Sequence, residues 1–145
     1  MQKEWVIMNK SVSLKNLLPA LIKAQSEFPV ILKTEVNPFF KSKYADLSTI
    51  LEAVNPVLRK NGLVIIQTVE RTVLETTLFH ESDEFITSYI NIDEGIKEPQ
   101  KFGSAITYYR RYGIQAILNL AAEDDDGEGA KHEEMPKKPT KKEII

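Results

Sequence analysis

Apolar positions along the first part of the chain predict two amphipathic helices. From residue 14 to 28, apolar side chains recur at steps of three and four, which is the period of one helical face. The same period runs from residue 47 to 58, after Asp46, a residue type suited to capping a helix N-terminus. Pro19 is tolerated only in a first turn, so we expect the first helix to begin near Asn16. Residues 29–45 are predicted to be irregular or partly extended.

The period changes between residues 63 and 92. Residues 63–69, 73–79 and 85–92 are rich in β-branched and aromatic side chains and are separated by short polar joints. They predict a three-stranded antiparallel meander. In the third strand, alternation places Ile86, Ile90 and Ile92 inward and Thr87, Tyr89 and Asn91 outward.

A third helix is predicted over about residues 101 to 120, after a loop that ends at Pro99. Neighbouring residues of a helix point about 100° apart, so Arg110 and Arg111 face different surroundings. Arg111 shares a polar face with Tyr108, whereas Arg110 lies nearer the packed side and needs a partner there. The order helix, helix, three strands, helix predicts an α+β fold, in which a three-stranded β-meander packs with helices on one face.

Composition separates one domain, residues 1–122, from a polar tail, residues 123–145. The domain holds 14 lysines and arginines against 13 acidic residues, and the tail holds 5 against 8. A nearly neutral domain can bind a polyanion only through a local cluster of cations. The chain has no cysteine, no apolar run long enough to span a membrane and no secretory pattern at its start, which favours an intracellular, membrane-free location.

The sequence shows no pattern typical of an enzyme. It lacks a phosphate-binding loop, a dinucleotide-binding glycine turn and a nucleophile elbow, so we expect neither catalysis nor a cofactor. Asp124, Asp125 and Asp126 precede Gly127, but the spacing of an EF-hand loop fails, and a solvated helix exit explains them better than a metal site.

Residues 37–47, NPFFKSKYADL, combine aromatic rings with lysines. A single-stranded nucleic acid offers phosphates to Lys41 and Lys43, and base faces to rings such as Tyr44. Two interpretations remain for Phe39 and Phe40: they pack onto the helix that starts at Leu47, or they stack on bases.

Residues 103–115, GSAITYYRRYGIQ, form a second candidate cluster. Near the predicted start of the third helix, Gly103 and Ser104 leave backbone N–H groups available to a phosphate. Arg110 and Arg111 add two cations, and Tyr108 adds a ring. A solvated helix face explains the same residues equally well.

Together these segments resemble the ERF (essential recombination function) family of phage single-strand annealing proteins over about residues 14–127. The resemblance rests on residues 37–47, on Gly103–Tyr108 with Arg110–Tyr112, and on Asp124–Gly127. It implies ATP-independent annealing of complementary DNA strands in phage recombination and repair, an oligomer, and a meander-plus-helix core. Tyr109 and Gly113 depart from the family by standing where alanine-like residues are expected, and Gly113 is expected to loosen the helix.

The hypothesis for this chain is a ring or filament of protomers holding one DNA strand along a shared groove, in the cytoplasm of a bacterial host. The further partners expected are a phage exonuclease or a host single-strand binding protein. We also expect Trp5–Ile7 to form a short strand between protomers. The predicted DNA-binding residues are Lys33, Asn37, Phe39, Phe40, Lys41, Lys43, Tyr44, Arg59, Ser104, Tyr108, Arg110 and Arg111.

Two alternatives stay open. One is a single-stranded nucleic-acid-binding protein that coats strands without annealing them. The other is a magnesium-dependent nuclease that uses Asp124–Asp126.

Overall fold

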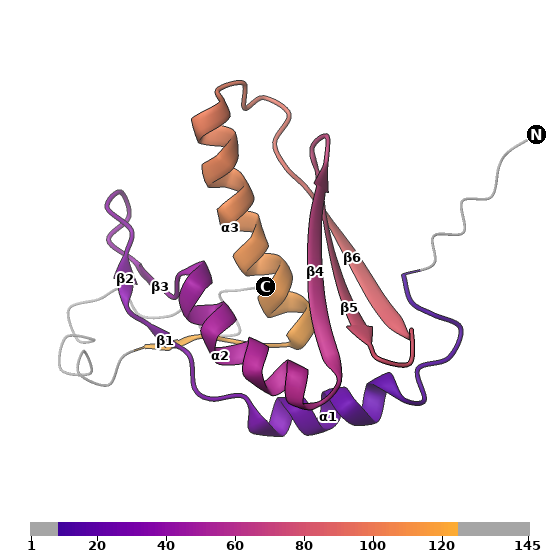
Figure 1. Ribbon diagram of the computed structural model, residues 1–145. Coiled ribbons are helices and arrows are strands. Elements are labelled where there is room, and N and C mark those ends of the chain that lie inside the picture. The colour runs from indigo at the N-terminus through magenta and orange to yellow at the C-terminus, as the bar shows by residue number, and fades with distance from the viewer. Residues whose placement is uncertain (1–8, 125–145) are drawn as a thin grey trace, which may run out of the picture.

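Strands β4, β5 and β6 form the antiparallel meander, which lies to the right of α3 in Figure 1. The computed structural model describes residues 9–124 of the chain. The helices are α1 (Leu17–Glu27), α2 (Leu47–Lys60) and α3 (Pro99–Leu118). The strands are β1 (Leu32–Lys33), β2 (Glu35–Val36), β3 (Lys43–Tyr44), β4 (Leu63–Glu70), β5 (Val73–His80), β6 (Phe85–Asn91) and β7 (Glu123–Asp124). The predicted α+β class, the meander and the element order are confirmed.

The first two helices begin where the sequence predicts, through different contacts. Asp46 caps α2, because its carboxylate accepts a hydrogen bond from the Thr49 backbone N–H at 2.9 Å. Asn16 precedes α1 but makes no side-chain cap. Instead, Glu84 accepts hydrogen bonds from the backbone N–H groups of Asn16 and Leu17, at 2.9 and 2.8 Å. A carboxylate next to β6 therefore anchors the start of α1 to the sheet.

The third helix begins two residues earlier than predicted. Pro99 takes its first turn, where a missing N–H costs nothing, rather than ending the loop. Gly103 and Ser104 consequently lie beyond the first turn, and their N–H groups face carbonyls of the same helix. The expectation that these N–H groups are available to a phosphate is wrong.

The hydrophobic core lies between the three helices and one face of the sheet. Leu74 and Leu78 of β5 are fully buried there, as are Val54 of α2 and Ile114 of α3. Gly113 sits against this face: a Cβ added to it would lie 2.6 Å from the Thr76 hydroxyl oxygen. The glycine therefore allows α3 to approach β5 closely. Its role is close packing, rather than the loosening of the helix expected from sequence.

The opposite face of the sheet, here called the outer face, carries no helix among residues 9–124. Val64 and Ile66 of β4 and Tyr89 of β6 are each about half exposed on it. Thr87 also lies on this face but is buried, and its hydroxyl pairs with that of Thr77 at 2.9 Å. Apolar and aromatic side chains thus meet solvent on the outer face.

The segment between α1 and α2 is partly extended, as predicted, and folds into a small hairpin. β2 and β3 pair antiparallel, while β1 pairs parallel with β7. Figure 1 shows the β2–β3 hairpin standing away from the body, on the opposite side of α3 from the sheet. Within residues 9–124, no helix is long and apolar enough to cross a membrane. The expected strand at Trp5–Ile7 and nearly all of the tail lie outside the described residues.

Candidate nucleic-acid interface

A groove runs between the β2–β3 hairpin and α3. It consists of two neighbouring hollows of about 320 and 300 Å³, which share Tyr44 and Arg111. The first is also lined by Asn37, Pro38, Asp46, Leu47, Ser104, Thr107 and Tyr108. The second is also lined by Lys33, Lys43, Ala45, Tyr112, Gln115, Ala121 and Ala122. We call these two hollows together the groove.

Arg111 lies at the centre of the groove and is held among tyrosine rings. Its guanidinium carbon is 4.4 Å from the centre of the Tyr44 ring and 5.4 Å from that of Tyr108. One of its nitrogens, Nη1, donates a 3.4 Å hydrogen bond to the Ala45 carbonyl. Because a guanidinium carries five N–H donors, most of its donors remain for a ligand. The rings hold the cation in one orientation, and such contacts are worth roughly 0.5–1 kcal/mol at exposed sites.

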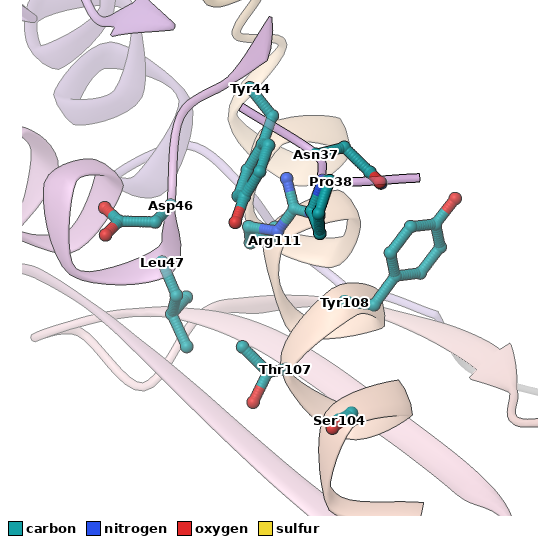
Figure 2. A pocket seen from close by; sticks show the side chains of 9 residues that line it. All are labelled: Asn37, Pro38, Tyr44, Asp46, Leu47, Ser104, Thr107, Tyr108 and Arg111. Atoms are coloured by element: carbon teal, nitrogen blue, oxygen red, sulfur yellow. The ribbon is translucent and has the colours of Figure 1, made fainter. Parts of the chain in front are cut away.

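Cations outnumber carboxylates among the described side chains that line the groove. Lys33 and Lys43 line it together with Arg111, and Asp46 is the one carboxylate among the lining side chains that the structure describes. Hydrogen bonds from Thr49, with a smaller contribution from Arg111, lower the pKa of Asp46. Figure 2 shows the Asp46 carboxylate directed away from the Arg111 guanidinium. Asp46 serves mainly as the cap of α2.

Two tyrosines of α3 extend the groove as a ring surface. Tyr108 and Tyr112 lie one turn apart, with ring centres 4.8 Å apart, and each is nearly half exposed. A hydrogen bond with Tyr108, together with partial burial, raises the pKa of the Tyr112 hydroxyl. A tyrosine hydroxyl is uncharged at neutral pH even without this shift, so it does not repel a phosphate. Exposed rings beside cations are the arrangement that single-stranded nucleic acids use, with bases on the rings and phosphates on the cations.

Seven of the residues predicted from sequence converge on this groove from three separate segments. They are Lys33, Asn37, Lys43, Tyr44, Ser104, Tyr108 and Arg111. In particular, Lys43 and Arg111 line the same hollow, although 68 positions separate them in the chain. The expected convergence of the segment before α2 with α3 is present in the fold.

Arg110 and Arg59 lie elsewhere. The Arg110 Nε donates a 3.0 Å hydrogen bond to the Gln67 side chain on β4, so the partner expected on the packed side is found. Arg59 lines a separate hollow on α2, with Glu52 and Asn55. The structure does not bring either arginine into the groove.

Phe39, Phe40 and Lys41 form the tip of the β2–β3 hairpin and line neither hollow. The two rings are 87% and 81% exposed. The interpretation that they pack onto the helix starting at Leu47 is therefore wrong. Below the tip, only Asn37 and Lys43 of this hairpin's polar residues reach the groove.

Tyr112 and Thr107 are among the groove residues that the predicted DNA-binding set lacks. Tyr112 lies one turn after Tyr108, and its ring centre is 5.8 Å from the Arg111 guanidinium carbon. The four-residue spacing of the two tyrosines on a predicted helix was the available signal.

The alternative hypothesis of a magnesium-dependent nuclease gains no support from the described residues. Residues 9–124 hold no group of three or more side chains able to bind a metal ion. Asp125 and Asp126 lie outside the described residues, so the nuclease hypothesis stays untested.

Comparison with protein families matches residues 18–144 to the ERF superfamily. Searches among curated proteins and among solved structures found no significant match. The family is one of single-strand annealing and recombination proteins of phage type, which bind single-stranded DNA and are in general not enzymes. The match spans nearly the whole sequence, including the residues that build the groove, and the chain belongs to the ERF family.

Proposed function

We propose that this protein binds single-stranded DNA in the groove and anneals complementary strands without ATP, in homologous recombination and repair of phage DNA. The observation that carries the proposal is the convergence of Lys33, Lys43 and Arg111 beside tyrosine rings, in a chain of the ERF family. Cations suit the phosphates, and exposed rings suit unpaired bases. The protein supplies no bond-making chemistry in this scheme.

The open shape of the groove supports annealing rather than simple storage of a strand. Annealing needs a strand whose phosphates are held while its bases remain reachable by a second strand. The groove lies between the hairpin and α3, is lined by Lys33, Lys43 and Arg111, and is only partly enclosed. A strand held in an extended form loses less conformational entropy when it pairs.

The small number of cations in one groove supports the proposal that several copies assemble. Three cations in one groove neutralise few phosphates, and the domain as a whole is nearly neutral. Repeating the groove in a ring or filament adds the contacts of each copy along one strand, which multiplies affinity and makes it steeply salt-dependent. A phage exonuclease that exposes single strands, or a host protein that coats them, would act next to this assembly in the bacterial cytoplasm.

The test is an annealing assay with two complementary oligonucleotides and no nucleotide cofactor. We expect the protein to raise the annealing rate, and Arg111→Met to lower both the rate and the affinity for one strand. Arg59→Met is the matched control, because it removes an arginine that lies outside the groove. A protein that bound single strands tightly but slowed their pairing would instead be the coating protein of the alternative hypothesis.

A further inference from the structure

The tip of the β2–β3 hairpin is built to present two rings. The Asn37 side-chain oxygen accepts hydrogen bonds from the backbone N–H groups of Phe39 and Phe40, at 2.8 and 3.2 Å. The Lys41 N–H donates to the Asn37 carbonyl at 2.7 Å, and Lys41 has a positive φ of 54°. These contacts define the turn, while both rings remain over four-fifths exposed. A defined turn with two solvent-exposed phenylalanines indicates a partner surface.

On the other side of α3, the outer face of the sheet offers a surface that fits this tip. A hollow of about 490 Å³ lies where this face meets the β4–β5 turn. Tyr89 and Val73 contribute apolar surface to it, and Glu70, Glu75 and Glu94 contribute three carboxylates against the single cation Arg71. We call it the outer-face hollow. Its character is apolar and acidic, and half-exposed Val64 and Ile66 continue the apolar surface along β4.

The two surfaces are complementary but cannot meet within one chain. The tip brings two rings and the cation of Lys41, and the hollow brings a ring, an aliphatic side chain and excess negative charge. Figure 1 shows the hairpin and the sheet on opposite sides of α3. We propose that the hairpin tip of one chain docks into the outer-face hollow of a second copy of this chain.

Such a contact accounts for assembly and deepens the proposed function, on which it rests. The two surfaces differ, so the contact is head-to-tail and repeats from copy to copy, closing into a ring or continuing as a filament. The docking hairpin also forms one wall of the groove. Each contact therefore places the groove of one copy beside the sheet of the next. Stacking of bases on Phe39 and Phe40 is the competing use of the tip, and it is less favoured because the tip lines neither hollow of the groove.

The test uses two full-length variants, each of which removes one half of the contact. Phe39→Ser with Phe40→Ser alters the tip, and Glu70→Lys with Glu94→Lys reverses the charge of the hollow. All four side chains are exposed, so both variants should fold, which circular dichroism checks. Ile22→Ser is the control, because it removes a 66% exposed apolar side chain from α1. The mass of each protein in solution is the readout.

We expect wild type and the control to contain several protomers and each variant to contain one. Mixed in equal amounts, the two variants should form a species of two protomers, because one retains the hollow and the other retains the tip. Either variant assembling like wild type would overturn the proposal, as would a mixture that stays at the mass of one chain.

A second measurement separates this proposal from that of DNA binding. Affinity for an oligonucleotide too short to bridge two copies should be unchanged in the tip variant, because Lys43 and Arg111 are intact. A tip variant that keeps the wild-type mass but loses this affinity would assign the tip to bases and overturn the docking. Arg111→Met should instead keep the wild-type mass. If it also kept full affinity for DNA, the groove would be wrong and the docking would stand.

Discussion

Arg110 and Arg111 are adjacent in α3, yet the helix directs them to two different regions of the molecule. Arg110 turns to the sheet, where its Nε meets the Gln67 side chain at 3.0 Å. Arg111 turns to the groove, where its guanidinium carbon lies 4.4 Å from the centre of the Tyr44 ring. Arg110 thus has its hydrogen-bond partner inside the fold. Arg111 stacks on a tyrosine ring and has room for a ligand. The charge is the same in both, so the surroundings decide whether it serves packing or binding.

The two faces of α3 differ in the same way around these arginines. On the sheet side, Gly113 and Ile114 are buried, and the glycine removes the atom that would separate α3 from β5. On the groove side, Tyr108 and Tyr112 leave nearly half of their surface exposed. Substitutions on the sheet side should therefore change stability, and those on the groove side should change affinity.

The largest expected effect is that of Arg111→Met on the affinity for single-stranded DNA. We expect affinity to fall about tenfold or more, because hydrogen bonds between charged partners contribute roughly 1.5–3 kcal/mol. The slope of log affinity against log salt should also shrink by about 0.7 for each phosphate that the variant no longer neutralises. Titration of a labelled oligonucleotide at several salt concentrations measures both. Unchanged affinity together with a lowered melting temperature would show that Arg111 serves packing. Arg110 and Arg111 would then not differ in role.

The next effect is that of Gly113→Ala on stability. Its Cβ would lie 2.6 Å from the Thr76 hydroxyl oxygen and 3.2 Å from the Gln67 side-chain nitrogen. We expect a loss of about 1–3 kcal/mol in the free energy of unfolding, as is usual when atoms are added to a packed core. Denaturant unfolding is the measurement.

Gly103→Ala, on the same helix, is the matched control. No atom outside the local backbone lies within 4 Å of a Cβ placed there. The usual gain of about 0.5–1 kcal/mol for replacing a helical glycine by alanine should then appear. Equal responses of the two glycines would show that α3 does not pack closely on β5 at Gly113.

The sequence could predict which residues share a helix face, but not which contacts α3 makes with distant parts of the chain. Helical spacing depends on local geometry, so it placed Arg110 on the packed side and Arg111 beside Tyr108. The packing role of Gly113 depends on Thr76 and Gln67, which lie far away in the sequence. From the sequence alone, Gly113 was expected only to weaken the helix. The start of α1 is a similar case, because its N–H groups bond to Glu84 across the fold rather than to the local Asn16.

The groove itself was predictable in composition but not in detail. The segment 37–47 indicated a site by combining rings with lysines, and it does contribute Asn37, Lys43 and Tyr44. Which of its rings would be buried could not be read from a segment with no helical or strand period. Tyr44 faces Arg111, while Phe39 and Phe40 stand exposed on the hairpin, and this division depends on how β2 pairs with β3.

A smaller effect is expected for Arg110→Met, the counterpart of the Arg111 substitution. It leaves the Gln67 side-chain oxygen without the Arg110 donor, in a partly buried position. We expect a loss of about 1 kcal/mol in the free energy of unfolding, which is typical for one such hydrogen bond. Affinity for single-stranded DNA should stay within about twofold of wild type, because Arg110 bonds to the sheet and does not line the groove. A tenfold loss of affinity at native stability would return Arg110 to the binding residues.

The smallest effect concerns Tyr44, which touches the ligand-facing arginine from the opposite wall of the groove. Tyr44→Leu removes the ring over Arg111, and a cation–π contact at an exposed site is worth roughly 0.5–1 kcal/mol, so affinity should fall about two- to fivefold. Tyr44→Phe keeps the ring and should bind nearly as well as wild type. If Tyr44→Phe weakens binding as much as Tyr44→Leu, the hydroxyl contacts the DNA directly. If neither Tyr44→Leu nor Tyr44→Phe weakens binding, Arg111 does not need the Tyr44 ring to bind DNA. The side chains on the groove side of α3 are then held less firmly than those on its sheet side.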